Sequence, residues 1–160
     1  MVREHHRFKV SMISDKRNVR IGISAKQTEG DESYDSEPVS MNVICDGVIT
    51  EEDGNVCIEY EEHLSKDGET TRTKLFWKKE EPKSVSMFRT GEVSMACLFS
   101  SGERCACSYK TQDLTLEFFI VTKSVKNTLS LSGGSIGVSY NMEVKGITVS
   151  RNEYKLTVIK

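Results

Sequence analysis

Cysteines are the residues whose spacing in this sequence most directly suggests chemistry. Cys105 and Cys107 stand two positions apart in "CACSY", and Cys97 precedes Cys105 by eight positions. In a strand, Cys105 and Cys107 share a face with Cα atoms about 6.5 Å apart, at the upper limit for a disulfide. A structural zinc site needs a second Cys or His pair at matching spacing, and the sequence lacks one. The spacing therefore favours packing of free thiols over a metal or redox centre.

A second group consists of polar residues at positions that strand alternation assigns to the interior of a sheet. If Ile58 faces the interior of a sheet, Tyr60 and Glu62 face it too, and Arg89 shares a face with Met87. An inward carboxylate is costly unless it is paired. We therefore predict that Glu62 lies near Arg89, together with Tyr60, at one mouth of a barrel. Either the pair fixes the strand register, or it anchors a small ligand in an otherwise apolar cavity.

The rest of the sequence offers few candidates for catalytic residues. His5 and His6 fall in an N-terminal tail, and His63 ends a strand on its polar face, where a solvated histidine is the default interpretation. The glycines of "SGGSIG" (132–137) lack the lysine and the strand-to-helix context of a phosphate loop. We predict no catalytic residue, no metal site and no cofactor, and hence a protein that is not an enzyme.

The elements that must position these residues are strands, because hydrophobic residues alternate with polar ones almost throughout the chain. Asp53-Gly54 and Asp67-Gly68 predict hairpin turns, and Pro38 and Pro82 fall in connections. The predicted strands are 18–25, 39–49, 55–64, 70–78, 84–90, 92–100, 105–111, 114–125, 127–132, 135–145 and 153–160.

This pattern predicts an all-β fold: a single closed antiparallel up-and-down barrel of about 8–10 strands, with a two-sheet sandwich as the alternative. Residues 1–16 are expected to form an N-terminal tail and residues 17–160 the barrel domain. Each strand has one apolar and one charged face, so the sheet must enclose one interior, and closure also removes its edges.

Several stretches resemble a known family when they are taken in order. They are "CDGVITEEDGNVCIEYEEH", "RTKLFW", "FRTGEVSMACLF", "TLEFF" and "SRNEYKLTV". Together they resemble the bacterial YwiB-like family of calycin-like, or lipocalin-like, β-barrel proteins over residues 39–160. The chain departs from the family pattern after Tyr109, where Gln112 and Leu114 replace a proline and a glycine. The resemblance implies a fold and no particular activity.

Composition narrows the class of partner. The chain has 160 residues and a formal net charge of −2, so no global field would attract nucleic acid or an anionic membrane. Neither an apolar signal segment nor a run of about 20 apolar residues is present, and the five cysteines cannot all pair with one another. We therefore expect a soluble cytoplasmic protein that binds neither nucleic acid nor membrane.

Function follows from whether the barrel interior is open or filled. An open interior favours a non-enzymatic binding module for a small, partly apolar ligand. A filled barrel favours a scaffold whose partner is another protein. The candidate ligand-binding residues in the barrel interior are Tyr60, Glu62, Trp77, Arg89, Met95 and Phe99.

Overall fold

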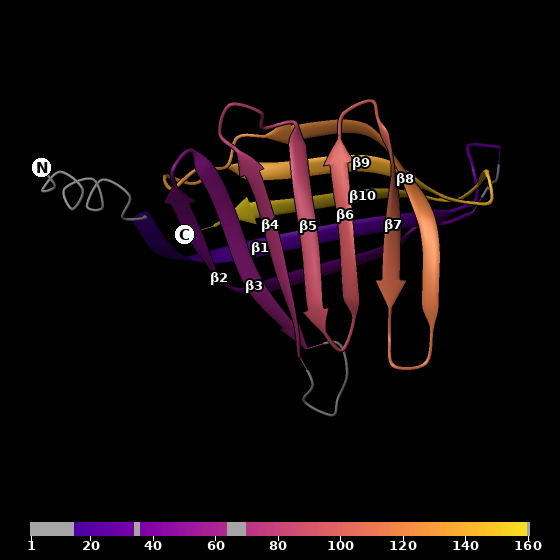
Figure 1. The fold of residues 1–160 in the computed structure, drawn as a ribbon, viewed down its shortest axis with the longest axis horizontal. Coiled ribbons are helices and arrows are strands. Elements are labelled where there is room, and N and C mark those ends of the chain that lie inside the picture. The colour runs from indigo at the N-terminus through magenta and orange to yellow at the C-terminus, as the bar shows by residue number, and fades with distance from the viewer. Residues whose placement is uncertain (1–14, 34–35, 64–69, 160) are drawn as a thin grey trace, which may run out of the picture.

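The strands close into an antiparallel barrel (Figure 1). The computed structural model describes residues 15–33, 36–63 and 70–159. Each strand pairs with the next along the chain, and β1 pairs with β10. The ten strands are β1 (Asp15–Glu29), β2 (Val39–Glu52), β3 (Asn55–His63), β4 (Thr70–Lys78), β5 (Ser84–Gly91), β6 (Ser94–Ser100), β7 (Arg104–Lys110), β8 (Thr115–Asn127), β9 (Ser135–Val144) and β10 (Ile147–Val158). The predicted up-and-down barrel is confirmed.

Two of the strand boundaries lie at tight hairpin turns whose residues have positive φ. Asp53 and Gly54 have φ values of 56° and 82°, the left-handed pair that a tight hairpin turn requires. Lys145 and Gly146 form a similar turn, with φ values of 52° and 80°. The predicted turn at Asp67-Gly68 and the histidines at positions 5 and 6 lie outside the described residues, as does most of the predicted tail. The described ranges contain no helix long and apolar enough to cross a membrane.

Two predicted elements were wrong. Residues 127–132 were expected to form a strand, but β8 ends at Asn127 and the residues beyond it form a connection. There Asn127 accepts a hydrogen bond from the backbone N–H of Leu129 through its side chain, which competes with strand pairing. β10 begins at Ile147 rather than at residue 153, because a register shift between Thr148 and Ser150 interrupts the alternation that would have marked it.

The barrel is flattened into two layers whose strands cross. Figure 1 shows β9, β10 and β1 running across β4 to β7 at a steep angle. β8 curves from one layer into the other, and its register against β9 shifts between Thr122 and Ser124, as a β-bulge permits. Side chains from the two layers meet inside: the rings of Phe99 and Tyr140 lie 4.9 Å apart. The two ends of the barrel differ in how far their inward-facing apolar side chains are buried.

One end of the barrel, which we call the closed end, is filled with apolar side chains. It lies towards the β2–β3, β4–β5, β6–β7 and β8–β9 connections. Val85 and Ile136 are completely buried there, and Trp77 and Leu129 nearly so. Fully burying one aliphatic or aromatic side chain contributes roughly 1.5–3 kcal/mol, so these buried side chains stabilise the closed end.

Candidate functional site

The two layers part at the other end, which we call the open end. β2 pairs with β3 only from Gly47 opposite Tyr60 onward, although β2 itself begins at Val39. On the other side, the pairing of β8 with β9 begins at Phe119, four residues after β8 starts. The described ladders therefore stop short at both seams between the layers.

Apolar side chains line this opening from both layers, and we call them the rim. On β2, β8 and β9 each stands at an inward-facing position, as the parity of the buried residues on that strand requires. On β10 the register shift between Thr148 and Ser150 brings Ile147 opposite Val144. Ile147 is nevertheless 67% exposed and Val39 73%, whereas the corresponding residues at the closed end are buried. The rim comprises Val39, Met41, Leu116, Val144 and Ile147.

Polar side chains from β3, β4 and β5 lie deeper, where the layers meet. Arg89 donates from Nη2 to both carboxylate oxygens of Glu62, at 2.7 and 3.3 Å, and from Nε to the hydroxyl of Thr73 at 3.3 Å. The strand register brings them together, because Thr73 lies opposite Arg89 on one side and Tyr60 on the other. The Glu62 side chain is 8% exposed and that of Arg89 23%. Desolvation alone would lower the pKa of Arg89, but the Glu62 carboxylate outweighs it and raises that pKa.

Two tyrosines link the layers beside this ion pair. The hydroxyl of Tyr60 on β3 lies 2.7 Å from that of Tyr154 on β10, across the interior. Burial raises the pKa of Tyr60 to about 12, and burial followed by the nearby Tyr60 raises the pKa of Tyr154. Both phenols are therefore neutral near pH 7 and act as hydrogen-bonding groups only.

Thr71 completes the polar group. It lies opposite Glu62 in the β3–β4 ladder and is fully buried. No described residue bonds its hydroxyl oxygen. Such a buried, unpartnered hydroxyl is uncommon in a folded protein and calls for an explanation. We call Tyr60, Glu62, Thr71, Thr73, Arg89 and Tyr154 the floor of the open end.

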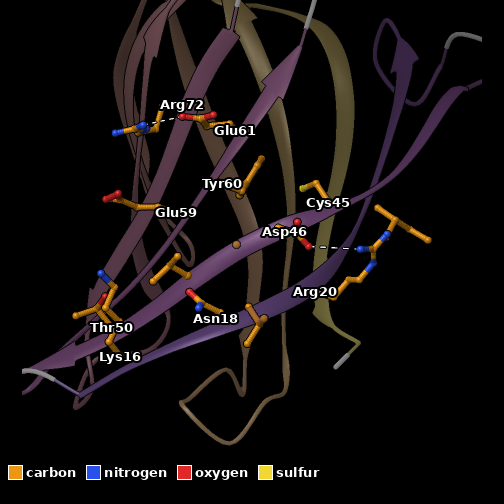
Figure 2. A pocket seen from close by; sticks show the side chains of 14 residues that line it. Lys16, Asn18, Arg20, Cys45, Asp46, Thr50, Glu59, Tyr60, Glu61 and Arg72 are labelled. Carbon is orange, nitrogen blue, oxygen red and sulfur yellow. Dashed lines mark hydrogen bonds and ion pairs between the residues drawn. The ribbon is translucent and has the colours of Figure 1, made fainter.

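A groove of about 1170 Å³ on the outside of β1 to β4 approaches this floor through the seam between β2 and β3 (Figure 2). Tyr60 and Cys45 belong to its wall. Burial, and then the negative charge of Glu62, raises the pKa of Cys45. The charged residues of the groove are Lys16, Arg20 and Arg72, against Asp46, Glu59 and Glu61. Three cations and three anions cancel, so the groove has no net attraction for a charged ligand.

Residues 21–156 match the family model described as "Domain of unknown function (DUF1934)". The chain belongs to this family. It also matches the solved structure of the YwiB protein from Bacillus subtilis at 20% identity, with 96% of this chain and 99% of that chain covered and a TM-score of 0.67. The resemblance to the YwiB-like family is thus confirmed, and the two proteins share a fold. No curated protein matched the chain.

The residues predicted to bind ligand fall into two groups in this DUF1934 barrel. Tyr60, Glu62 and Arg89 come together in the floor, and the predicted contact between Glu62 and Arg89 is present. Trp77 and Phe99 instead pack into the apolar core, where both are buried. The remaining candidate, Met95, is partly buried and lies opposite Arg89 in the β5–β6 ladder.

Sequence reasoning missed the residues contributed by the second layer and by β4. Tyr154 and Met41 shared the right parity on their strands, but only the barrel register places both next to Ala25 on β1. Thr71 shares a face of β4 with the buried Leu75 and Trp77, but the sequence does not show that its hydroxyl lacks a described partner. A count of inward-facing polar residues on every strand would have identified both Tyr154 and Thr71 from the sequence.

The cysteines of the DUF1934 chain are all free in the described residues. Cys97, rather than Cys105, is the neighbour of Cys107: the β6–β7 ladder pairs Ala96 with Ser108, so the next inward residues lie opposite one another. A hydrogen bond to Cys107, together with burial, raises the pKa of Cys97. No group of three or more His, Cys, Asp or Glu side chains among the described residues is arranged to hold a metal ion.

Proposed function

We propose that this protein is a non-enzymatic binding module that takes a small, partly apolar molecule at the open end of its barrel. The observation that carries the proposal is the contrast between the ends. Inward-facing apolar side chains are buried at the closed end and exposed at the rim. Apolar side chains that converge around a few fixed polar groups are typical of small-molecule sites. The rim supplies the apolar wall, and the floor supplies the polar groups.

The proposed site lies at the open end, whereas packed side chains fill the middle of the barrel. Ile58, Leu75 and Phe99 are each at most 2% exposed and belong to one packed cluster. Protein interiors of this kind are close-packed, so a ligand there would have to displace core side chains. The rim requires no such displacement, because its inward residues already face solvent.

A second function is favoured by the same packed cluster: a scaffold whose rim is covered by another protein. Exposed apolar patches on soluble proteins commonly mark interaction sites of either kind. The polar floor favours the small molecule, because a protein surface laid across the rim would leave the buried Thr71 hydroxyl unpartnered.

Native mass spectrometry of gently purified protein, compared with its denatured mass, tests the proposal first. A stoichiometric excess mass supports a bound small molecule, and a dimer mass without excess supports the scaffold. Binding of the neutral fluorescent probe N-phenyl-1-naphthylamine then tests the location. Met41→Gln on the rim should weaken the probe at least fivefold, and Leu116→Gln should do the same.

Ile44→Gln is the matched control. Ile44 lies on β2 like Met41, is 62% exposed, and faces the outer groove instead of the interior. The substitution should leave probe affinity unchanged. If Ile44→Gln weakens the probe and Met41→Gln does not, the outer groove is the binding site and the proposed location is wrong.

A further inference from the structure

The floor holds two hydrogen-bonding groups to which no described residue is bonded. Arg89 uses Nη2 for Glu62 and Nε for Thr73, and among the described residues no acceptor is bonded to its Nη1. The Thr71 hydroxyl is likewise without a partner there. A guanidinium presents five N–H donors in a fixed fork and accepts nothing, so its free N–H groups require an acceptor. A ligand group placed beside Arg89 would therefore have to accept hydrogen bonds, and the Thr71 hydroxyl is able to donate to the same acceptor.

The charge of the floor decides which acceptor fits. Glu62 and Arg89 already neutralise each other at 2.7 Å. A ligand carboxylate would add a second negative charge beside Glu62, and a ligand ammonium would add a second positive charge beside Arg89. An uncompensated charge in a desolvated site is costly. The tyrosines offer no compensation, because burial keeps Tyr60 protonated, with a pKa of about 12.

The distance between the floor and the rim limits the rest of the molecule. From Tyr154 in the floor, the inward face of β10 continues through Asn152 to Ser150, which are polar and buried, and β10 still pairs with β1 there. Four residues of strand at about 3.3 Å each give roughly 13 Å. Beyond this point Ile147 and Val144 lie opposite each other on the rim.

We propose, on the basis of the function proposed above, that the open end takes a neutral carbonyl compound. Its carbonyl oxygen accepts hydrogen bonds from Arg89 Nη1 and the Thr71 hydroxyl, and its apolar body extends about 13 Å from the floor to reach the rim. No bond is made or broken in the protein or the ligand. The protein recognises a ketone, ester or amide group and discriminates against acids and amines of the same length.

Three probes with matched alkyl chains test this chemistry: 2-undecanone, decanoate and decylammonium, each measured at pH 7 by displacement of N-phenyl-1-naphthylamine from the full chain. We expect 2-undecanone to bind about tenfold more tightly than either charged probe. Thr71→Val should weaken 2-undecanone about three- to tenfold, the effect of one hydrogen bond, and leave the reporter dye unchanged. Because the Thr71 hydroxyl has no described partner, valine removes no contact that the fold depends on.

Thr122→Val provides the control. Its hydroxyl is also buried without a described partner, but Thr122 lies on β8 opposite Tyr140, outside the floor. This variant should bind 2-undecanone like the unmodified chain. Decanoate binding more tightly than 2-undecanone, or equal losses in the two threonine variants, would overturn the carbonyl assignment alone. Failure of the dye and all three probes to bind would instead overturn the proposed function.

Discussion

Replacing Glu62 by glutamine separates the charge of the floor from its shape. Glutamine keeps an acceptor for Arg89 Nη2, so the 2.7 Å contact survives as a hydrogen bond to a neutral group. Because Arg89 stays charged, this bond still contributes about 1.5–3 kcal/mol, and what is lost is the attraction between opposite charges. The guanidinium loses its nearby counter-charge while only 23% of its side chain is exposed. Breaking a fully buried pair costs about 3–5 kcal/mol, so the expected total is about 2–3 kcal/mol.

Urea denaturation of Glu62→Gln, Arg89→Met and the double variant measures this cost. The double variant should be destabilised by less than the sum of the single ones, because neither charge is then left without its partner. Asp46→Asn is the control: it removes an anion from an ion pair whose side chains are 60% and 86% exposed, and should leave the free energy of unfolding unchanged. Additive single costs, or Glu62→Gln within about 0.5 kcal/mol of the unmodified chain, would refute the reasoning.

Other regions make equally specific predictions. Burial raises the pKa of Tyr140 from 10 to about 12, so the folded state keeps a proton that the unfolded state loses, and stability should fall as pH rises from 10 to 12. Denaturation at several pH values should show a smaller fall in Tyr140→Phe; an unchanged fall would contradict this origin. Gly91→Ala should be far more destabilising than Gly102→Ala in thermal unfolding, because an added Cβ would lie 2.3 Å from a backbone oxygen at Gly91 and meet nothing within 4 Å at Gly102. In peptide mapping of native protein labelled with iodoacetamide, Cys105 should react before the buried Cys97, and the reverse order would contradict the assigned inward packing.

Much of the fold could be predicted because alternation is a local property. The hairpin at Asp53-Gly54 and the inward positions of Ile58 and Leu75 follow from neighbouring residues alone. The error at β10 had a local cause too, since the register shift after Thr148 displaces the alternation by one residue. Local patterns fail where the chain departs from regular pleating.

The candidate site was only half predictable. The contact of Glu62 with Arg89 depends on β3, β4 and β5, three strands consecutive in sequence. The bond between Tyr60 and Tyr154 depends on barrel closure and on how the layers cross, and these residues are 94 positions apart. Trp77 illustrates the converse: its inward parity was correct, but parity does not tell which end of the barrel a residue occupies.

The seams between the layers also determine how the molecule should fluctuate. At the closed end, the inward side chains of neighbouring strands are buried together. At the open end, residues 39–46 of β2 pair with β1 on one side only within the described ladders. Backbone amides that lack a second neighbouring strand open at low free-energy cost, whereas core amides open only with global unfolding. Amide hydrogen exchange should therefore be graded along the barrel axis, slowest around Ile58 and fastest near Val39, so that the rim can adjust to a bound molecule while the packed core stays intact.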